Sequence, residues 1–471
     1  MAGLILAFAL TGCRGCEKKE VDNNTYKEKE DDISVSNNVV ETEGLVMTSL
    51  AGYEKKGTKK ALISCSGKET GFTVIDTETG KEAASGRIRY GETQSVEGKT
   101  YGICDFTSLE KEGSFYLQTD SGISSEEFVI KESLYRELLK VRIKVSDEAG
   151  AGREDIDRYN LGKNFLYVTD LVLAEEFFGE QEEKANVNKK DKNKDDNGRS
   201  KKNNAVIPDS INAAKLTTDK LKKLMNEHGV LDTSLRADCG IYYQYGAVMS
   251  LFAYEYGQYD SDYAEECSVL AEASYKHAEE MYSKGSGDVK RKADDKRFWA
   301  AAQLYKLTGE PEYRETAEAY AGDPPEGFCE NKNGYLGTIA YLTSYNKIDL
   351  DIGEMFIMAL MEDINEVIKK ESVDAFLTAA VKGDGEEQIS DAFETARLMV
   401  LGNYITKNIK YVDTAESYLD YLYGMNMLGK DYAYDSSSDH YSEPQAFILA
   451  GLIDSYIYED REPEAMGRME N

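Results

Sequence analysis

Residues 297–320 most strongly limit what this chain can fold into, because they read as two short helices joined by a tight turn. Apolar side chains recur every three or four residues from Phe298 to Tyr305, which is the spacing of one helix face. Gly309 suits the left-handed conformation that ends a helix, and Pro311 has the backbone angle of a first helical turn. A hairpin this short cannot bury its apolar face alone. Similar patterns follow Leu161 throughout the chain, so the sequence predicts an array of helical hairpins.

Length and charge narrow the class of protein. A chain of 471 residues with 41% hydrophobic residues is too long for one ordinary domain and has ample material for a large core. Its net charge of −31 repels phosphate backbones and argues against binding to nucleic acid. The three histidines, His228, His277 and His440, form no cluster with the spacing of metal ligands, so we expect no structural zinc.

The first residues predict export and anchoring. The apolar run GLILAFAL is too short to span a bilayer stably but has the length of a signal-peptide core. The LTGC that overlaps its end resembles a bacterial lipobox, in which Cys13 is lipidated after cleavage. We therefore expect a lipoprotein signal peptide over residues 1–12 and a protein held at the extracellular face of the membrane by its lipid alone. A plain signal peptide is the alternative.

The polar composition that follows predicts a flexible tether over residues 13–57.

Short alternating runs between Lys60 and Ile130, separated by turn residues, predict a small β-sandwich over residues 58–131. Cys65 and Cys104 would pair if they faced each other across the sandwich. An unpaired buried cysteine is the other interpretation.

Several segments resemble one enzyme family in the correct order. FWAAAQLYKLTGEPEY at 298–313 is similar to the FWAAAELYxATGDxxY segment of glycoside hydrolase family 9, the inverting cellulases built on an (α/α)6 barrel. VIPDSINAAKLTTDKLKKL at 206–224 and YLDYLYGMNMLGKDY at 418–432 resemble two further family segments. GFTVIDTETGKEAASGRI at 71–88 and EGSFYLQTDSG at 112–122 resemble the immunoglobulin-like module that precedes many of these enzymes.

This resemblance implies a mainly α protein, with the (α/α)6 barrel preceded by a small immunoglobulin-like β-sandwich. The glycosidase-like domain is expected over residues 132–462. It is interrupted at 180–204, where a low-complexity charged composition cannot build a core. The single tryptophan, Trp299, is expected in the core by its place in the helical hairpin rather than as a platform for sugar rings.

The catalytic base is expected before the first long apolar helix, where the family carries GGWxDAGDYGKY and this chain carries DEAGAGREDIDRYNLG at 147–162. Alignment on Arg158 and Tyr159 places Asp155 at the base, with Gly152 where the family has an assisting Asp. Asp157 is a possible substitute for Asp155, and a solvated acidic loop is a third interpretation. Tyr159 is a candidate substrate contact.

The catalytic acid of the family is a Glu at the start of the last helix, after a loop whose His and Arg residues hold sugar hydroxyls. The resemblance implies Glu443 as acid and His440 as a substrate contact. Residues 442–445 read as a capping box, which would put Glu443 in the first helical turn. The alternative is that Glu443 only complements the helix dipole. The family's WWGSN is replaced by KGDGEEQ at 382–388.

Together these features imply a cell-surface glycoside hydrolase of the cellulase or endoglucanase type that acts on β-glucan polysaccharide or oligosaccharide with inversion. Glu443 would be the acid and Asp155 the base. The resemblance implies no cofactor, and we expect a monomer. The alternative is a family relative that has lost hydrolysis and binds a glycan or a protein partner.

Overall fold

The computed structural model describes residues 44–65, 69–90, 95–96, 99–148, 156–179, 206–226, 228–321, 332–371, 378, 386–426, 428–433 and 445–459. The predicted signal peptide with Cys13, and the predicted insertion 180–204, lie outside these residues. None of the helices in the described part is long and apolar enough to cross a membrane.

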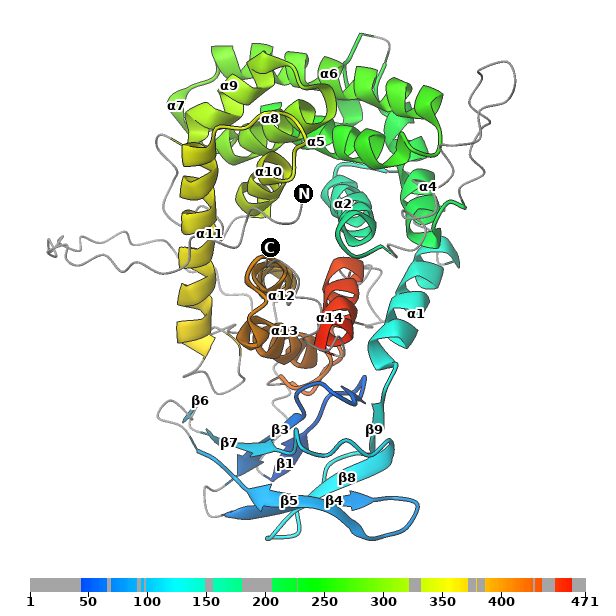
Figure 1. Ribbon diagram of the computed structural model, residues 1–471, viewed down its shortest axis with the longest axis vertical. Helices are drawn as coiled ribbons and strands as arrows, with labels where there is room; N and C mark the ends of the chain where they lie inside the picture. Colours follow the sequence, from blue (N-terminus) through cyan, green and yellow to red (C-terminus); the bar gives the residue numbers. More distant parts are fainter. Residues whose placement is uncertain are drawn as a thin grey trace, which may run out of the picture. The chain divides into compact units, whose positions relative to one another are not determined.

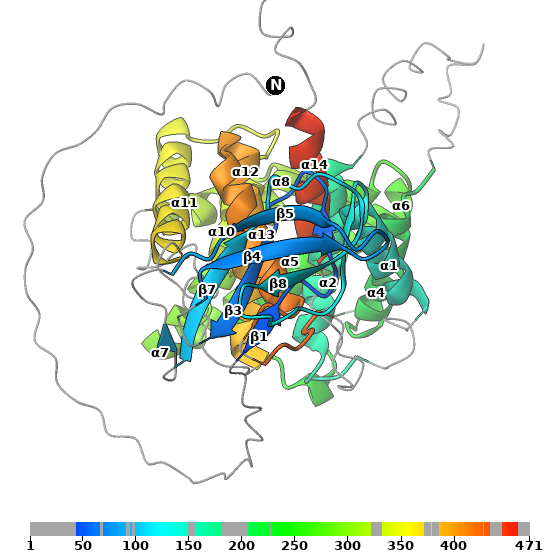
Figure 2. The ribbon, with the colours of Figure 1, turned by 90° about the horizontal axis from the view of Figure 1, so that it is seen from below.

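The amino-terminal part is a β-sandwich of two sheets (Figures 1 and 2). The strands are β1 (Leu45–Met47), β2 (Tyr53–Glu54), β3 (Lys60–Cys65), β4 (Gly71–Asp76), β5 (Glu82–Arg87), β6 (Ser95–Val96), β7 (Lys99–Asp105), β8 (Gly113–Thr119) and β9 (Phe128–Lys131). One sheet has the order β1-β3-β7-β6 and the other β2-β9-β8-β4-β5. The alternation read from the sequence is present in β4, where Phe72 and Val74 are buried between half-exposed neighbours. Their side chains belong to the sandwich core.

The sandwich begins earlier than the sequence suggested. Strands β1 and β2 both lie inside the segment expected to be a tether up to residue 57. Val46, Met47 and Tyr53 are buried, so this stretch supplies apolar side chains that repay its ordering. The tether prediction is therefore wrong for residues 45–54.

The register of strands β3 and β7 keeps the two sandwich cysteines, Cys65 and Cys104, too far apart to form a disulfide with each other. In the antiparallel pairing of β3 and β7, Cys104 lies opposite Ala61, whereas Cys65 lies opposite Thr100. A shift of four residues corresponds to about 13 Å along a strand. That separation is about twice the Cα distance that a disulfide spans, so the register itself excludes the bond.

The carboxyl-terminal part is an (α/α)6 barrel in which an inner ring of helices is surrounded by an outer one. Figure 1 shows α2, α10, α12 and α14 facing one another across the middle of the barrel. The inner helices are α2 (Leu161–Phe178), α5 (Cys239–Tyr256), α8 (Asp294–Thr308), α10 (Lys332–Leu342), α12 (Glu386–Thr406) and α14 (Ala446–Glu459). The outer helices are α1 (Leu134–Glu148), α4 (Asp209–Lys223), α6 (Ser261–Lys284), α9 (Pro311–Tyr320), α11 (Leu350–Glu371) and α13 (Ile409–Leu422), and short α7 (Gly287–Arg291) lies between α6 and α8.

The helical hairpin predicted at residues 297–320 is confirmed. Helix α8 ends at Thr308, and Gly309 follows in the left-handed conformation with φ 76°. Helix α9 then starts with Pro311 in its first turn. Trp299 is only 3% exposed and lies in the core, as its position in the hairpin predicted.

The inner helices run parallel to one another, as contacts between neighbours establish. Asn333 Nδ2 donates to Asp295 at 2.7 Å near the start of α10 and α8. Lys306 Nζ donates to Thr343 Oγ1 at 2.8 Å near the end of both. Helices α2 and α14 have the same sense, because Asp170 contacts Ala446 and, further along both helices, Phe178 lies against Gly451. The amino ends of these helices therefore lie at one end of the barrel.

The sandwich meets the barrel around one buried carboxylate, Glu416 of α13. Its Oε2 accepts hydrogen bonds from the backbone N and Oγ1 of Thr58, at 2.9 and 2.8 Å. Its Oε1 accepts from the hydroxyl groups of Tyr135 in α1, at 2.8 Å, and Tyr456 in α14. A single side chain thus joins the sandwich to two helices of the barrel besides its own.

Candidate functional site

The candidate catalytic segments lie on connections that enter inner helices. Residues 149–160 join α1 to α2, and residues 423–445 join α13 to α14. Since the inner helices are parallel, both connections reach the barrel at its same end. The KGDGEEQ segment at 382–388 runs into the first turn of α12, which begins at Glu386, the amino end of another inner helix. Segments nearly 300 residues apart in sequence therefore share one end of the barrel.

Three of the predicted site residues, Asp155, His440 and Glu443, lie outside the described residues. Asp157 and Tyr159 are described. Asp157 Oδ1 accepts hydrogen bonds from the backbone N–H groups of Tyr159, at 2.7 Å, and Asn160, at 3.1 Å. This carboxylate orders the turn before α2. Tyr159 is 77% exposed, with the Arg158 guanidinium 4.6 Å from its ring centre.

The start of α14 differs from the predicted capping box. The helix begins at Ala446, so Gln445 precedes it instead of occupying its third position. The backbone N–H groups of Ala446 and Phe447 donate to Asp170 Oδ2, at 2.7 and 3.4 Å. The cap thus comes from a carboxylate on α2, because a buried helix end needs acceptors and tertiary packing supplies one. The prediction that Ser442 and Gln445 form a local capping box is wrong.

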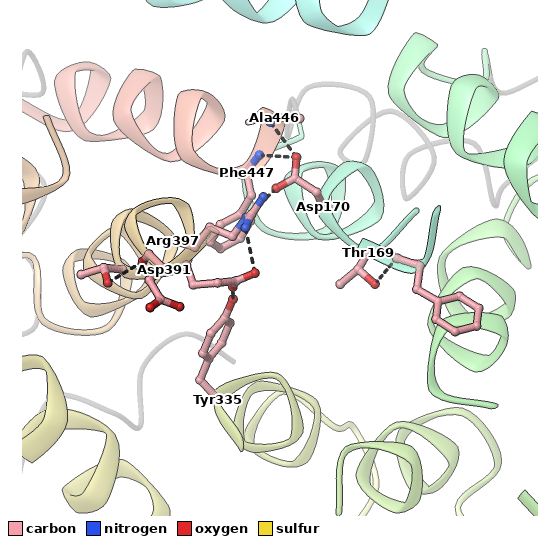
Figure 3. A network of polar contacts seen from close by, with 10 residues as sticks. Thr169, Asp170, Tyr335, Asp391, Arg397, Ala446 and Phe447 are labelled. Carbon is pink, nitrogen blue, oxygen red and sulfur yellow. Dashed lines mark hydrogen bonds and ion pairs between the residues drawn. The ribbon is translucent and has the colours of Figure 1, made fainter. Parts of the chain in front are cut away.

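Asp170 is also part of a buried polar network in the middle of the barrel (Figure 3). Its Oδ1 accepts a hydrogen bond from Arg397 Nε on α12 at 3.0 Å. The same guanidinium donates to Glu394 at 3.1 Å, and Glu394 accepts from the hydroxyl of Tyr335 on α10. Burial raises the pKa of Asp170, and the neighbouring Arg397 opposes that rise. The network joins four inner helices, α2, α10, α12 and α14.

A second hydrogen-bond chain ends at Gln445. Arg142 on α1 donates through its NH2 group to the hydroxyl of Tyr423 at 3.1 Å. The Tyr423 hydroxyl donates to Gln445 Oε1 at 2.8 Å. Helices α1 and α2, which flank the connection carrying Asp155, are therefore both linked to the start of α14, which follows Glu443.

Another polar group lies where α5, α8 and α10 begin. Asp295 accepts from Asn333 Nδ2, and Asn333 Oδ1 accepts from Gln244 Nε2 at 3.3 Å. Lys296 Nζ is 3.5 Å from Asp295. These residues add carboxylate and amide groups, the types that hydrogen-bond sugar hydroxyls, to the end of the barrel that holds the candidate segments.

No sequence motif singled out Asp170, Arg397 or Arg142. A signal existed, because Asp170 is the one charged residue in the apolar run FLYVTDLVLA at 165–174. A charge within such a run is costly to bury unless it is paired. The sequence could therefore have marked Asp170 as a buried, partnered group, although not its partners.

Comparison with known families identifies the two parts. Residues 236–452 match Glycosyl hydrolase family 9, and residues 43–124 match Cellulase N-terminal ig-like domain. The chain carries a glycoside hydrolase family 9 domain. The immunoglobulin-like module precedes it, in the order that the sequence segments implied.

The chain is also similar to several known proteins. It is 22% identical over 362 residues to a cellodextrinase of Butyrivibrio fibrisolvens, an alignment that spans 62% of this chain and 64% of the relative. A metagenome-derived family 9 endoglucanase superposes with a TM-score of 0.66 at 16% identity, over 83% of this chain and 85% of the other. A Bacteroides ovatus family 9 protein superposes with a TM-score of 0.65 at 16% identity, over 88% of this chain and 99% of the other. AaCel9A in complex with a cellobiose-like isofagomine superposes with a TM-score of 0.65 at 15% identity, over 87% of this chain and 100% of the other. The structural matches share the fold.

Proposed function

We propose that this protein hydrolyses β-glucan chains or their oligosaccharides with inversion, as an endoglucanase-like enzyme of family 9. The family 9 domain supports a glycoside hydrolase. The name of the cellodextrinase relative and the cellobiose-like ligand of the AaCel9A structure support a β-glucan substrate. The observation that carries the proposal is the parallel inner ring, because it brings the connections bearing Asp155 and Glu443 to one end of the barrel.

In this mechanism Glu443 protonates the leaving glycosidic oxygen while Asp155 removes a proton from the attacking water on the opposite face of the sugar. Inverting enzymes hold the two carboxyl groups about 6.5 to 9.5 Å apart, which leaves room for the water. Asp155 and Glu443 come from two separate connections, so they can lie on opposite sides of a bound sugar with room for a water between them. Asp157 is the less favoured base, because its Oδ1 already accepts two backbone hydrogen bonds at the start of α2.

A general acid must stay protonated until it reacts, and a free helix amino end would lower its pKa. The first two N–H groups of α14 are already bound by Asp170. The carboxylate of Asp170 therefore offsets the positive end of the helix dipole that Glu443 would otherwise meet. This arrangement supports Glu443 as acid rather than as a residue that only complements the helix.

We also propose that the protein acts at the cell surface, held by a lipid on Cys13. The lipobox-like LTGC supports this location. Cys13→Ala should release the protein from the membrane fraction into the soluble fraction. Unchanged membrane fractionation of that variant would reject the lipid anchor.

A second candidate function is glycan or partner binding without hydrolysis. It is favoured by the sequence differences at the site: Gly152 where the family has the assisting Asp, and KGDGEEQ where it has WWGSN. Retention of the wild-type protein on a β-glucan column, without release of reducing sugar from soluble β-glucan, xylan or cello-oligosaccharides, would establish this alternative.

The deciding experiment compares wild type with Glu443→Gln and Asp155→Asn on soluble β-glucan and cello-oligosaccharides. Each variant keeps the shape of the side chain but removes its proton chemistry, so kcat should fall about 10²- to 10⁴-fold while binding survives. Asp157→Asn is the matched control on the same connection and should cost much less. NMR of the first product should show the inverted anomer. Retained activity in Glu443→Gln would reject Glu443 as the acid.

A further inference from the structure

We propose that the junction between the sandwich and the barrel is an acid-tightened latch, in which a proton on Glu54 allows the carboxyl groups of Glu54 and Glu416 to lie close together. Loss of that proton as pH rises toward neutrality loosens the sandwich from the barrel. The groups that form the latch come from β2, the turn after it, α1, α13 and α14. The latch does not depend on hydrolysis of a glycan.

Tyr135, at the start of α1, links the two carboxyl groups. Its backbone N–H donates to Glu54 Oε2 at 3.1 Å, and its hydroxyl donates to Glu416 Oε1 at 2.8 Å. Gly57 lies between the same two side chains, because a Cβ added to it would be 2.5 Å from Glu416 Oε1 and 3.3 Å from Glu54 Cβ. Only the width of a glycine backbone therefore separates the two side chains, and both are buried.

The hydrogen bonds around Glu416 suit its ionised form. Its Oε2 accepts from the backbone N–H and the hydroxyl of Thr58, and its Oε1 accepts from the hydroxyls of Tyr135 and Tyr456. An ionised carboxyl group has only acceptor sites, and here two donors reach each oxygen. A second negative charge on Glu54 would face Glu416 inside the buried junction, where like charges held close together oppose each other's ionisation.

The ammonium group of Lys59 is directed away from these carboxylates. Lys59 is fully buried, and its Nζ donates to the backbone oxygens of residues 54, 55 and 57, at 3.4, 2.7 and 2.7 Å. An ammonium group has three protons, so this geometry commits them to the turn that follows β2. Lys59 therefore orders the turn that carries Gly57 and Thr58, and the carboxyl groups depend on neutral donors.

Other charged and titratable groups face Glu54 and Glu416 from each element packed against them. Asp420 lies one helical turn after Glu416, so one face of α13 carries two carboxyl groups. Burial and the Glu416 charge raise the pKa of Asp420, and the Ser49 side chain and the Lys60 charge oppose that rise. The full set is Tyr53 in β2, Lys55 and Lys59 in the turn, Lys60 in β3, Asp105 and Glu110 at and after the end of β7, Tyr135 in α1, Asp420 in α13 and Tyr456 in α14. Carboxyl groups outnumber lysines in this set, so ionisation of Glu54 adds to an excess of negative charge.

The pH range of the latch follows from Glu54. Burial raises the pKa of Glu54 to about 7, the Tyr135 N–H opposes this rise, and the Glu416 charge adds to it. In an opened junction Glu54 is hydrated, and its pKa returns toward the ordinary value of 4.5. The closed junction therefore holds the proton more tightly. Its stability is greatest below about pH 4.5 and falls as pH rises to about 7.

Apolar contacts keep the two parts together when the latch opens. Met47, Leu62 and Tyr101 of the sandwich belong to the same buried apolar cluster as the core of the barrel. These side chains do not change charge between pH 4.5 and 7. Opening therefore loosens residues 53–58 and the hydrogen bond from Leu50 N to the Tyr423 carbonyl, which is 2.7 Å long, without releasing the sandwich.

The test is amide hydrogen exchange of the full-length protein between pH 4.5 and 8. Exchange is expressed as protection factors, which remove the intrinsic pH dependence of the reaction. In wild type, protection of peptides covering residues 50–58 and 133–139 should fall about 5- to 30-fold between pH 4.5 and 7 and then level off. In Glu54→Gln, which has no proton to release, it should stay constant over that range.

The matched control is Glu132→Gln. Glu132 lies 3.5 Å from Lys55 of the same turn, but its side chain is 65% exposed, so this variant should keep the wild-type decline. Peptides of the β4–β5 hairpin, residues 71–87, exchange through local openings that leave Glu54 in place, and their protection should not change with pH.

The wild-type measurements alone can overturn the latch. Constant protection of the junction peptides between pH 4.5 and 7 would do so. Protection as high as that of α5, in the core of the barrel, would mean that the junction opens only by global unfolding, and would also reject it. A decline in Glu54→Gln as steep as in wild type would exclude Glu54 as the group that holds the proton.

Discussion

The barrel and its junction with the sandwich each contain a buried carboxylate, and the two are satisfied in different ways. Asp170, inside the barrel, is bound by the Arg397 guanidinium and by backbone N–H groups of α14. Glu416, at the junction, accepts from a backbone N–H and three hydroxyl groups, belonging to Thr58, Tyr135 and Tyr456. One centre relies on an opposite charge, whereas the other relies on several neutral donors.

The surroundings of the two centres strengthen this contrast. Glu54 and Asp420 are further carboxyl groups near Glu416, and burial together with the Glu416 charge raises the pKa of both. The buried Lys59 amine does not relieve them directly, because its hydrogen bonds go to the backbone oxygens of residues 54, 55 and 57. Among the described residues, the Glu416 carboxylate at the junction is therefore hydrogen-bonded by neutral donors, whereas the Asp170 carboxylate in the barrel is hydrogen-bonded by a cation. This difference predicts unequal responses to substitution and to pH.

The largest effect is expected for Arg397→Leu. It leaves the carboxylates of Asp170 and Glu394 buried without their cation, which should lower the free energy of unfolding by about 3 to 5 kcal/mol. Chemical denaturation would measure it, and adding Asp170→Asn should recover part of the loss. Arg291→Leu is the control, since that arginine pairs with Asp288 on the surface, where both side chains are 78% exposed. A cost below 1 kcal/mol for Arg397→Leu would contradict the role given to the ion pair.

Glu416→Gln should cost less, about 2 to 3 kcal/mol. An amide replaces one accepting oxygen with an NH2 group, which then meets donors such as Thr58 or Tyr135 instead of acceptors. The sandwich should loosen from the barrel, so limited proteolysis near Thr58 should quicken along with the loss of stability. Glu266→Gln, at a Glu that is 66% exposed beside Lys222, should change neither. A loss as large as that of Arg397→Leu would remove the distinction between the two centres.

Glu54→Gln tests the pH response of the junction. Burial raises the pKa of Glu54 to about 7, from about 4.5 when unfolded. The folded state therefore holds this proton more tightly, and the stability that Glu54 contributes is present below about pH 4.5 and lost as pH rises to about 7. In Glu54→Gln the loss of folding stability between about pH 4.5 and pH 7 should be smaller than in wild type. The expected difference is about 1 to 2 kcal/mol after allowance for solvent screening.

Thermal unfolding between pH 4 and 8 measures that change. Glu137→Gln is a control of opposite sign, because the hydrogen bond from Lys131 lowers the pKa of Glu137, so its contribution is lost as pH falls. A decline equally steep in Glu54→Gln and wild type would exclude Glu54 as its source.

The smallest effect is expected for Thr58→Val. The change removes one hydroxyl donor to Glu416 while the backbone N–H of residue 58 continues to donate, so the cost should be about 1 kcal/mol. In a double-mutant cycle with Glu416→Gln the two costs should be less than additive, since both act on one carboxylate. Thr77→Val removes an exposed hydroxyl that donates to the Ser114 carbonyl and should cost less. If the two losses in free energy of unfolding were strictly additive, the Thr58 hydroxyl would not act through Glu416.

Local sequence determined the helical hairpins and most of the sandwich, because both depend on the period of apolar residues and on turn residues such as Gly309 and Pro311. The same reasoning placed Trp299 in the core. It placed the start of the sandwich too late, because β1 and β2 are too short to show a period and are stabilised by pairing with distant β3 and β9. Resemblance to family 9 supplied the candidates Asp155, Asp157 and Glu443, which no periodicity could have marked.

Only the tertiary structure decided how the buried polar groups are satisfied. A capping box is a local pattern, and Ser442 with Gln445 fits it, yet the N–H groups of α14 are bound by Asp170, which lies 276 residues earlier. Arg142 and Tyr423 reach Gln445 because barrel closure brings α1, α13 and α14 together. A sequence states which side chains need partners, since burial of an unpaired polar group is costly, but the partner is whichever group the closed ring places within about 3 Å.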